Sequence, residues 1–166
     1  MIPHEKAMVE RLKDKPFALI GINSDGDRDV SEKLDEKEQQ VLKGLGRTAD
    51  EGLDKIRAGD AAALAKANAD APALVKKVRD ADRENLVKIL DKNGISWRQA
   101  VEGSTGGPWA SQWNVQGWPT IYVLDAQGVI RFRDLRGEEL ENAVVKLLDE
   151  AAASDKSSGK PSSGHR

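Results

Sequence analysis

The chain lacks cysteine, has few aromatic residues and contains no long apolar run. Without a thiol it can form no disulfide, and it has no cysteine nucleophile or cysteine metal ligand. No apolar stretch approaches the roughly 20 residues that a membrane-spanning helix requires. The first residues, Met1–Lys6, have neither the apolar core nor the cleavage signal of an export peptide. Taken alone, such a sequence is typical of a cytoplasmic protein without a membrane segment.

Charge of one sign is also missing, because 26 basic and 28 acidic residues are interspersed along the 166 residues. A nucleic-acid-binding protein needs a clustered basic face, so nucleic acid is not an expected partner. The length suits one domain with a core of ordinary size, which we expect over residues 1–153. Residues 154–166 are rich in Ser, Gly, Lys and Pro, and this composition predicts a disordered tail.

The N-terminal part predicts a helix followed by a buried strand. Apolar residues recur at helical spacing between Pro3 and Lys13. Residues Phe17–Asn23 are then almost all apolar, so both faces of this segment are apolar. Such a run is typical of an interior strand in a mostly parallel sheet. Residues 24–27 carry the polar and glycine residues of a turn.

The middle of the chain, from about Asp29 to Lys92, is rich in Ala, Lys, Glu, Asp and Leu. Glycines and Pro72 divide it, which predicts several short helices rather than one long helix. The segments that begin at Asp27 and at Asp82 resemble two helix starts, and we expect them to flank a helical insertion over about residues 31–81. Gly94 is expected to cap the last of these helices at its C-terminus.

The C-terminal part predicts a short helix, a hairpin and a final helix. After a short extended piece at Ile95–Val101, the loop Gly103–Pro108 is expected to start a short helix, with Ser or Thr as its cap. Two strands, Thr120–Leu124 and Val129–Arg133, flank a turn at residues 126–128. Residues Glu138–Ala153 have the apolar spacing of an amphipathic helix.

The phrase Gly117-Trp118-Pro119-Thr120-Ile121-Tyr122-Val123-Leu124-Asp125 resembles the cis-proline loop and terminal hairpin of the thioredoxin superfamily. With Phe17–Asp25 and Gly94–Arg98, it is most similar to TlpA/ResA-like thiol–disulfide oxidoreductases. The resemblance implies an α/β, thioredoxin-like fold with a helical insertion. It also implies a substrate-binding loop at Gly117, Trp118, Pro119 and Thr120, with Pro119 in the cis form.

The same resemblance implies that the first core strand and the Cys-x-x-Cys motif are missing from this chain. Pro3 would follow the second cysteine, so catalytic residues are absent here, and we expect no cofactor and no metal. The partner would be an extended peptide or a protein disulfide at the cis-proline loop. The full-length protein would then be periplasmic or membrane-anchored. Unpaired buried backbone groups cost about 1–3 kcal/mol each. We therefore expect the chain to be marginally stable, to self-associate, or to pair Phe17–Asn23 directly with Thr120–Leu124.

Two other functions remain open: a cysteine-free module that binds extended peptides or a partner, and a non-functional remnant. Trp97, Trp109, Trp113 and Trp118 could form an aromatic platform, but packing within the protein is the favoured interpretation. Asp25, Asp27 and Asp29 have the spacing of a calcium loop but not its remaining ligands, so turn and capping roles are favoured. His4 is expected to be solvated, His165 to be inert, and residues 103–108 lack the signature of a phosphate loop.

Overall fold

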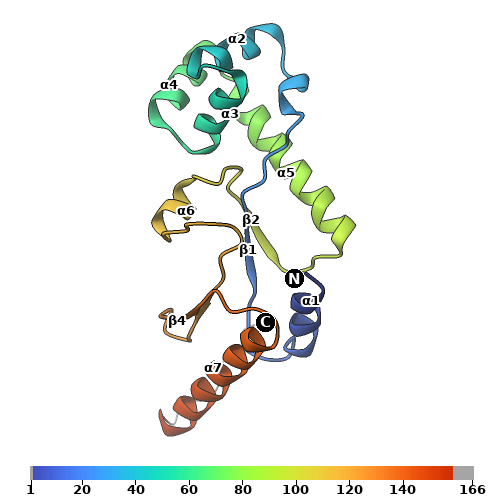
Figure 1. The fold of residues 1–166 in the computed structure, drawn as a ribbon, viewed down its shortest axis with the longest axis vertical. Helices are drawn as coiled ribbons and strands as arrows, with labels where there is room; N and C mark the ends of the chain where they lie inside the picture. The colour runs from blue at the N-terminus through green and yellow to red at the C-terminus, as the bar shows by residue number, and fades with distance from the viewer. Residues whose placement is uncertain (1, 159–166) are drawn as a thin grey trace. The chain divides into compact units, whose positions relative to one another are not determined.

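The computed structural model describes residues 2–158 and has a mixed α/β fold in which helices predominate (Figure 1). These residues form two compact units. One unit combines residues 2–19 with residues 119–158, and the other consists of residues 20–118. The second unit is therefore continuous in sequence and interrupts the first.

The first unit contains two helices and a hairpin. Helix α1 spans Ile2–Arg11 and helix α7 spans Gly137–Ser158. Their apolar faces meet strand β3 in one core, as the helical spacing predicted. Its buried members are Met8, Leu12, Val123, Leu140, Val144 and Leu147. Helix α7 continues past Ala153 to Ser158, where a disordered tail was expected, and residues 159–166 of that expected tail lie outside the described residues.

The predicted hairpin is confirmed. Strands β3, Tyr122–Leu124, and β4, Ile130–Arg133, pair in antiparallel register with Val123 opposite Phe132. Asp125 shapes the turn, since its Oδ1 accepts hydrogen bonds from the backbone N–H groups of Gln127 and Val129, each at 3.0 Å. Gly128 has φ of 80°, a conformation that glycine adopts without steric cost.

The second unit contains the predicted group of helices. They are the 3-10 helix η1 (Val30–Lys33), α2 (Glu36–Leu45), α3 (Ala49–Arg57), α4 (Ala61–Asp70) and α5 (Leu74–Asn93). The last of them, α5, is 20 residues long and not short. Side chains of Asp35, Thr48 and Asp60 cap the N-termini of α2, α3 and α4. Their apolar faces enclose a second core, whose buried members all lie between Val30 and Ala81.

The predicted helix start at Asp82 is wrong. Helix α5 is continuous from Leu74 to Asn93, and Asp82 lies in its middle as a buried residue. Its carboxylate binds Arg57 of α3 instead of capping a helix. Residue 81, where the insertion was predicted to end, therefore lies inside α5. Gly94 caps α5 in the left-handed conformation, with φ of 57°, as predicted.

The strand predicted to be interior is shorter and more exposed than expected. Strand β1, Ile20–Asn23, pairs in parallel with β2, Arg98–Val101, and these two strands form a sheet of their own. No residue of either strand is buried. The predicted direct pairing with Thr120–Leu124 is therefore wrong, because β3 pairs only with β4 among the described strands.

Candidate functional site

A buried glutamate holds the short helix α6, Pro108–Gln112, in place. Glu102 is the residue after β2. Its Oε1 accepts hydrogen bonds from the backbone N–H groups of Trp109 at 2.6 Å and Ala110 at 3.1 Å. The predicted Ser or Thr cap is wrong, because Gly107 occupies the cap position and offers no side chain. A carboxylate at a helix N-terminus also interacts favourably with the helix dipole. Glu102 therefore does the work of the missing cap.

Helix α6 turns its tryptophans outward. Ala110 is buried, whereas 48% of the Trp109 surface and 40% of the Trp113 surface are exposed. The Trp113 N–H donates to the Trp109 carbonyl at 2.9 Å, so the two residues lie one helical turn apart on the same side. Gln112, also exposed, lies on this side as well. We call Trp109, Gln112 and Trp113 the α6 face. These two tryptophans, for which packing within the protein was favoured, are therefore not core residues.

The stretch of sequence that contains the α6 face has no charged residue. No Asp, Glu, Lys or Arg occurs between Glu102 and Asp125, although a third of the whole chain is charged. The residues here are instead glycine, proline, tryptophan, one tyrosine and the uncharged polar types Ser, Thr, Asn and Gln, with a few aliphatic residues. This gap in the charge pattern is the sequence signal that would have indicated the α6 face.

The predicted substrate loop, Gly117 to Thr120, lies where the chain passes from one unit to the other. Trp118, at the end of the second unit, is 39% exposed, and space is open around Gly117 for a side chain. In the first unit, the Pro119 carbonyl accepts a hydrogen bond from Arg136 Nη2 at 2.6 Å. The role of these four residues in binding a peptide stays a prediction.

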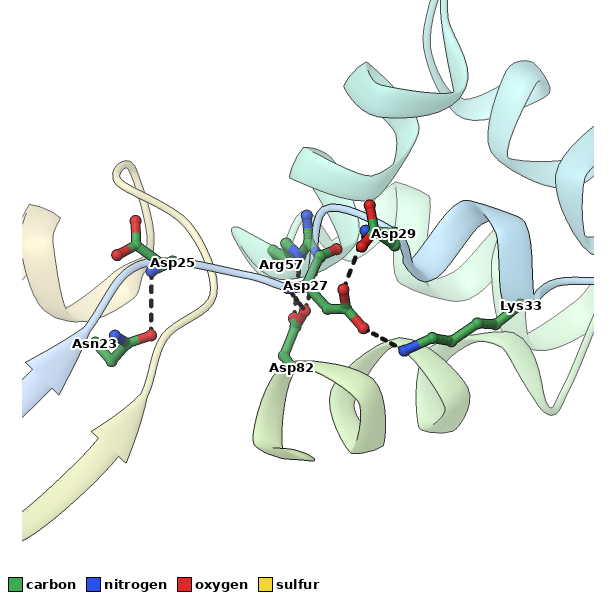
Figure 2. A network of polar contacts seen from close by, with 7 residues as sticks. All are labelled: Asn23, Asp25, Asp27, Asp29, Lys33, Arg57 and Asp82. Carbon is green, nitrogen blue, oxygen red and sulfur yellow. Dashed lines mark hydrogen bonds and ion pairs between the residues drawn. The ribbon is translucent and has the colours of Figure 1, made fainter. Parts of the chain in front are cut away.

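A polar clamp joins the start of the helical segment to α3 and α5. Arg57 donates from Nε to Asp82 Oδ2 at 3.0 Å and from Nη2 to Asp82 Oδ1 at 2.7 Å. The same Nη2 reaches the Asp27 carbonyl at 2.9 Å, and Asp82 Oδ1 accepts the Asp27 N–H at 2.7 Å. Figure 2 shows the Asp82 side chain pointing from α5 toward Asp27 and Arg57. Arg57 and Asp82 are largely buried, so water cannot solvate their charges and each is instead compensated by the opposite charge of the other.

The Asp27 carboxylate has partners of its own. Its Oδ1 accepts the Asp29 N–H at 3.0 Å and its Oδ2 accepts Lys33 Nζ at 2.6 Å (Figure 2). Burial alone would raise the pKa of Asp27, but these hydrogen bonds and the charges of Lys33 and Lys88 lower it below the usual aspartate range. Asp27 therefore acts in a turn, the role favoured over calcium binding. No group of three His, Asp or Glu side chains in residues 2–158 is placed to hold a metal.

A shallow cavity of about 390 Å³ lies beside the clamp, where β1 and β2 end. Open sheets of parallel strands bind ligands beside the carboxyl ends of those strands. Acidic and basic side chains occur together in its lining: Asp25, Asp54, Asp60, Arg28, Lys55 and Arg57. Three of these already bind within the protein, since Arg57 belongs to the clamp, Lys55 donates to a carbonyl and Asp60 caps α4. The cavity therefore has no dominant charge that would select a ligand.

His4, expected to be solvated, is only partly exposed on α1. Its Nε2 lies 3.7 Å from a carboxylate oxygen of Glu141 on α7, whose two oxygens bind Arg11. Arg11 thereby lowers the pKa of Glu141. These contacts attach α1 to α7 and bring no nucleophile to His4, so they support a structural role.

None of the described helices combines the length and the apolar character needed to cross a membrane. No model of a known protein family, no curated protein and no solved structure matches this chain.

Proposed function

We propose that this chain is the C-terminal part of a thiol–disulfide oxidoreductase of the thioredoxin superfamily, similar to TlpA/ResA-like proteins. Its central strand and its two cysteines would precede residue 1 in the full-length protein. By the same resemblance, we propose that the full-length protein works in the periplasm or attached to a membrane.

The exposed edge of β1 carries this proposal. The Asn23 carbonyl accepts the Glu102 N–H at 2.8 Å, so the backbone groups of Asn23 and Gly21 face β2. Because backbone groups alternate along a strand, those of Ile20 and Ile22 face the opposite edge. No described strand pairs there. A further strand at this edge would satisfy those groups and cover Ile20, which is now 55% exposed.

The proposed reaction is thiol–disulfide exchange. The thiolate of the first cysteine would attack a substrate disulfide and release one substrate thiolate. The second cysteine, as thiolate, would then attack the mixed disulfide, release the other substrate sulfur and close the enzyme disulfide. Two electrons thus pass from the enzyme dithiol to the substrate. This chain would contribute helix α1, whose N-terminus favours a nearby thiolate, and the loop Gly117–Thr120, where Trp118 would offer its backbone to an extended substrate.

A fusion that restores the missing part tests the proposal. A strand of alternating apolar residues that ends in Trp-Cys-Gly-Pro-Cys is joined before Ile2. We expect the first cysteine of the fusion to react with iodoacetamide at pH 6 faster than the same cysteine in the free peptide, because α1 lowers its pKa. We also expect the fusion to reduce a small aromatic disulfide, whereas the same fusion with serines in place of the cysteines does not.

Amide hydrogen exchange checks that the added strand docks on β1. In the unfused chain, the amides of Ile20 and Ile22 should exchange faster than those of Gly21 and Asn23, and the fusion should slow them. Ile20→Lys should abolish this protection, while Val87→Lys, at an equally exposed apolar position on α5, should not. Equal, strong protection of all four amides in the unfused chain would contradict the proposal.

A second candidate function is a peptide-binding module without redox chemistry. The observation that favours it is the exposed pair Trp109 and Trp113 on α6. Peptide binding by the unfused chain, combined with an inactive fusion, would support this function over the first.

A further inference from the structure

Two tryptophan rings on the α6 face form a surface that a folded protein seldom leaves to water. Trp109 and Trp113 are 48% and 40% exposed, although tryptophan is among the residues that contribute most when buried at an interface. The Cβ atoms of residues four apart on a helix are about 5–6 Å apart. The two rings therefore form adjacent contact positions.

The α6 face is also held in its conformation before any partner arrives. Glu102 fixes the start of α6 through two backbone hydrogen bonds, and the buried Ala110 holds its middle. The end is closed by the Val115 N–H, which donates to the Ala110 carbonyl at 2.9 Å, with Asn114 in the left-handed conformation. A surface fixed in this way loses little conformational entropy on binding.

The stretch of chain that carries the face contains no charged residue. Residues 103–124 contain no charged side chain, so nothing nearby in the sequence compensates a charged ligand. Gln112, which precedes Trp113 in sequence, offers an amide that can both donate to and accept from a neutral backbone. Side chains two residues apart lie on one face of an extended peptide, about 6–7 Å apart, which is close to the separation of Cβ atoms one helical turn apart.

We propose that the α6 face binds an uncharged, extended peptide segment, with proline or leucine side chains packed on Trp109 and Trp113. This inference rests on the proposed function, because it defines the kind of substrate segment that would reach the loop Gly117–Thr120, which follows α6 in the sequence. In the full-length protein, the α6 face would select uncharged sequence beside the substrate disulfide.

Calorimetric titration of the whole chain tests the proposal. The probe is a blocked ten-residue peptide of Pro, Leu, Ser and Gly without cysteine, and its partner peptide carries Glu in place of each Ser. We expect the neutral peptide to bind at least tenfold more tightly than the charged one. Trp109→Ala and Trp113→Ala should each weaken binding of the neutral peptide about tenfold or more, whereas Val87→Ala, a change at an exposed apolar position on α5, should leave it unchanged.

The variants separate this inference from the proposed function. If Trp118→Ala weakens binding while Trp109→Ala and Trp113→Ala do not, the loop role survives and the α6 inference fails. If the fusion is inactive but the α6 variants lose the peptide, the α6 face binds peptides without the proposed redox function. Equal binding of both peptides overturns the selection for uncharged sequence. Trp109-dependent binding of a neutral glucose oligosaccharide, without peptide binding, would overturn the peptide in favour of a glycan.

Discussion

At the scale of single residues, Arg57 and Asp82 form an ion pair in which both side chains are largely buried. Their side chains are only 10% and 4% exposed, and they make two hydrogen bonds with each other. Removal of one partner from such a pair leaves a buried charge without compensation, whereas removal of both does not. Breaking this pair is therefore expected to lower the free energy of unfolding by more than the intact pair contributes to it.

We expect Arg57→Met to destabilise the second unit by about 3–5 kcal/mol, because Asp82 then stays buried without its cation. All four tryptophans lie in this unit, so tryptophan fluorescence during urea unfolding measures its stability. The double variant Arg57→Met/Asp82→Leu should be more stable than Arg57→Met alone. Lys66→Met breaks an exposed pair with Asp70 and should cost less than about 1 kcal/mol. Equal losses in the single and double variants would contradict this account.

Asp27 makes the stability of the same unit depend on pH. Its pKa is lower in the folded protein than in the unfolded chain, so the unfolded state binds the proton more tightly. The stabilisation is therefore complete above the unfolded pKa of about 3.9 and is lost as pH falls through the lowered folded pKa. Urea unfolding from pH 6 to pH 2.5 should show the wild type more stable than Asp27→Asn at the upper end only. A stability difference that does not change with pH would count against this role.

At the scale of elements, the contact between α2 and α3 depends on a glycine. A Cβ at Gly52 would lie 2.2 Å from the Leu42 carbonyl oxygen, and that backbone atom cannot move without moving α2. Gly44 in α2 differs, because a Cβ there would meet only the end of the Lys66 side chain, at 3.7 Å. Two helix-interior glycines thus make opposite predictions for the same substitution.

We expect Gly52→Ala to destabilise the protein by about 1–3 kcal/mol, because the overpacked helices must separate. Gly44→Ala should be neutral or stabilising by up to about 1 kcal/mol, since alanine is the better helix former. Urea unfolding followed by circular dichroism measures both effects. If both variants were stabilised, the close approach of α2 and α3 would be wrong.

The sequence predicted correctly those helices and turns that are determined by residues close together in the chain. The spacing of Met8 and Leu12, the apolar face of α7, Gly94 after α5 and the turn at Gly128 are all readable over a few residues. The errors came from distant partners. The residues around Asp82 predicted a helix start, because a local pattern cannot show that Asp82 pairs with Arg57, 25 residues earlier in the chain. Trp109 and Trp113 were expected to pack within the protein, but α6, whose start is held by Glu102, leaves both exposed.

At the scale of the molecule, the apolar residues divide into two separate cores. Every buried member of one core lies between Val30 and Ala81, while the other joins both ends of the described chain. The choice of strand partners follows the same division, with β1 and β2 in one unit and β3 and β4 in the other. Pairing between distant strands cannot be deduced from the composition of either strand, which explains why the predicted partner of Phe17–Asn23 was wrong.

We expect a fragment of residues 24–94 to fold on its own, because it contains one complete core and the whole clamp of Asp27, Arg57 and Asp82. Circular dichroism should show cooperative thermal unfolding of a helical protein. The same fragment with Arg57→Met provides the comparison and should unfold at a lower temperature. A fragment without a cooperative transition would mean that the helices need the rest of the chain.

The hydrogen bond from the Asp27 N–H to Asp82 limits which segments could replace the native helices. It joins the residue that enters the helical segment to a side chain in the middle of α5, at 2.7 Å. A foreign helical bundle in place of residues 28–81 would remove Arg57 and leave Asp82 buried without a cation, so it would have to supply an arginine of its own. With that arginine present, a longer replacement would add little to the cost of closing the loop.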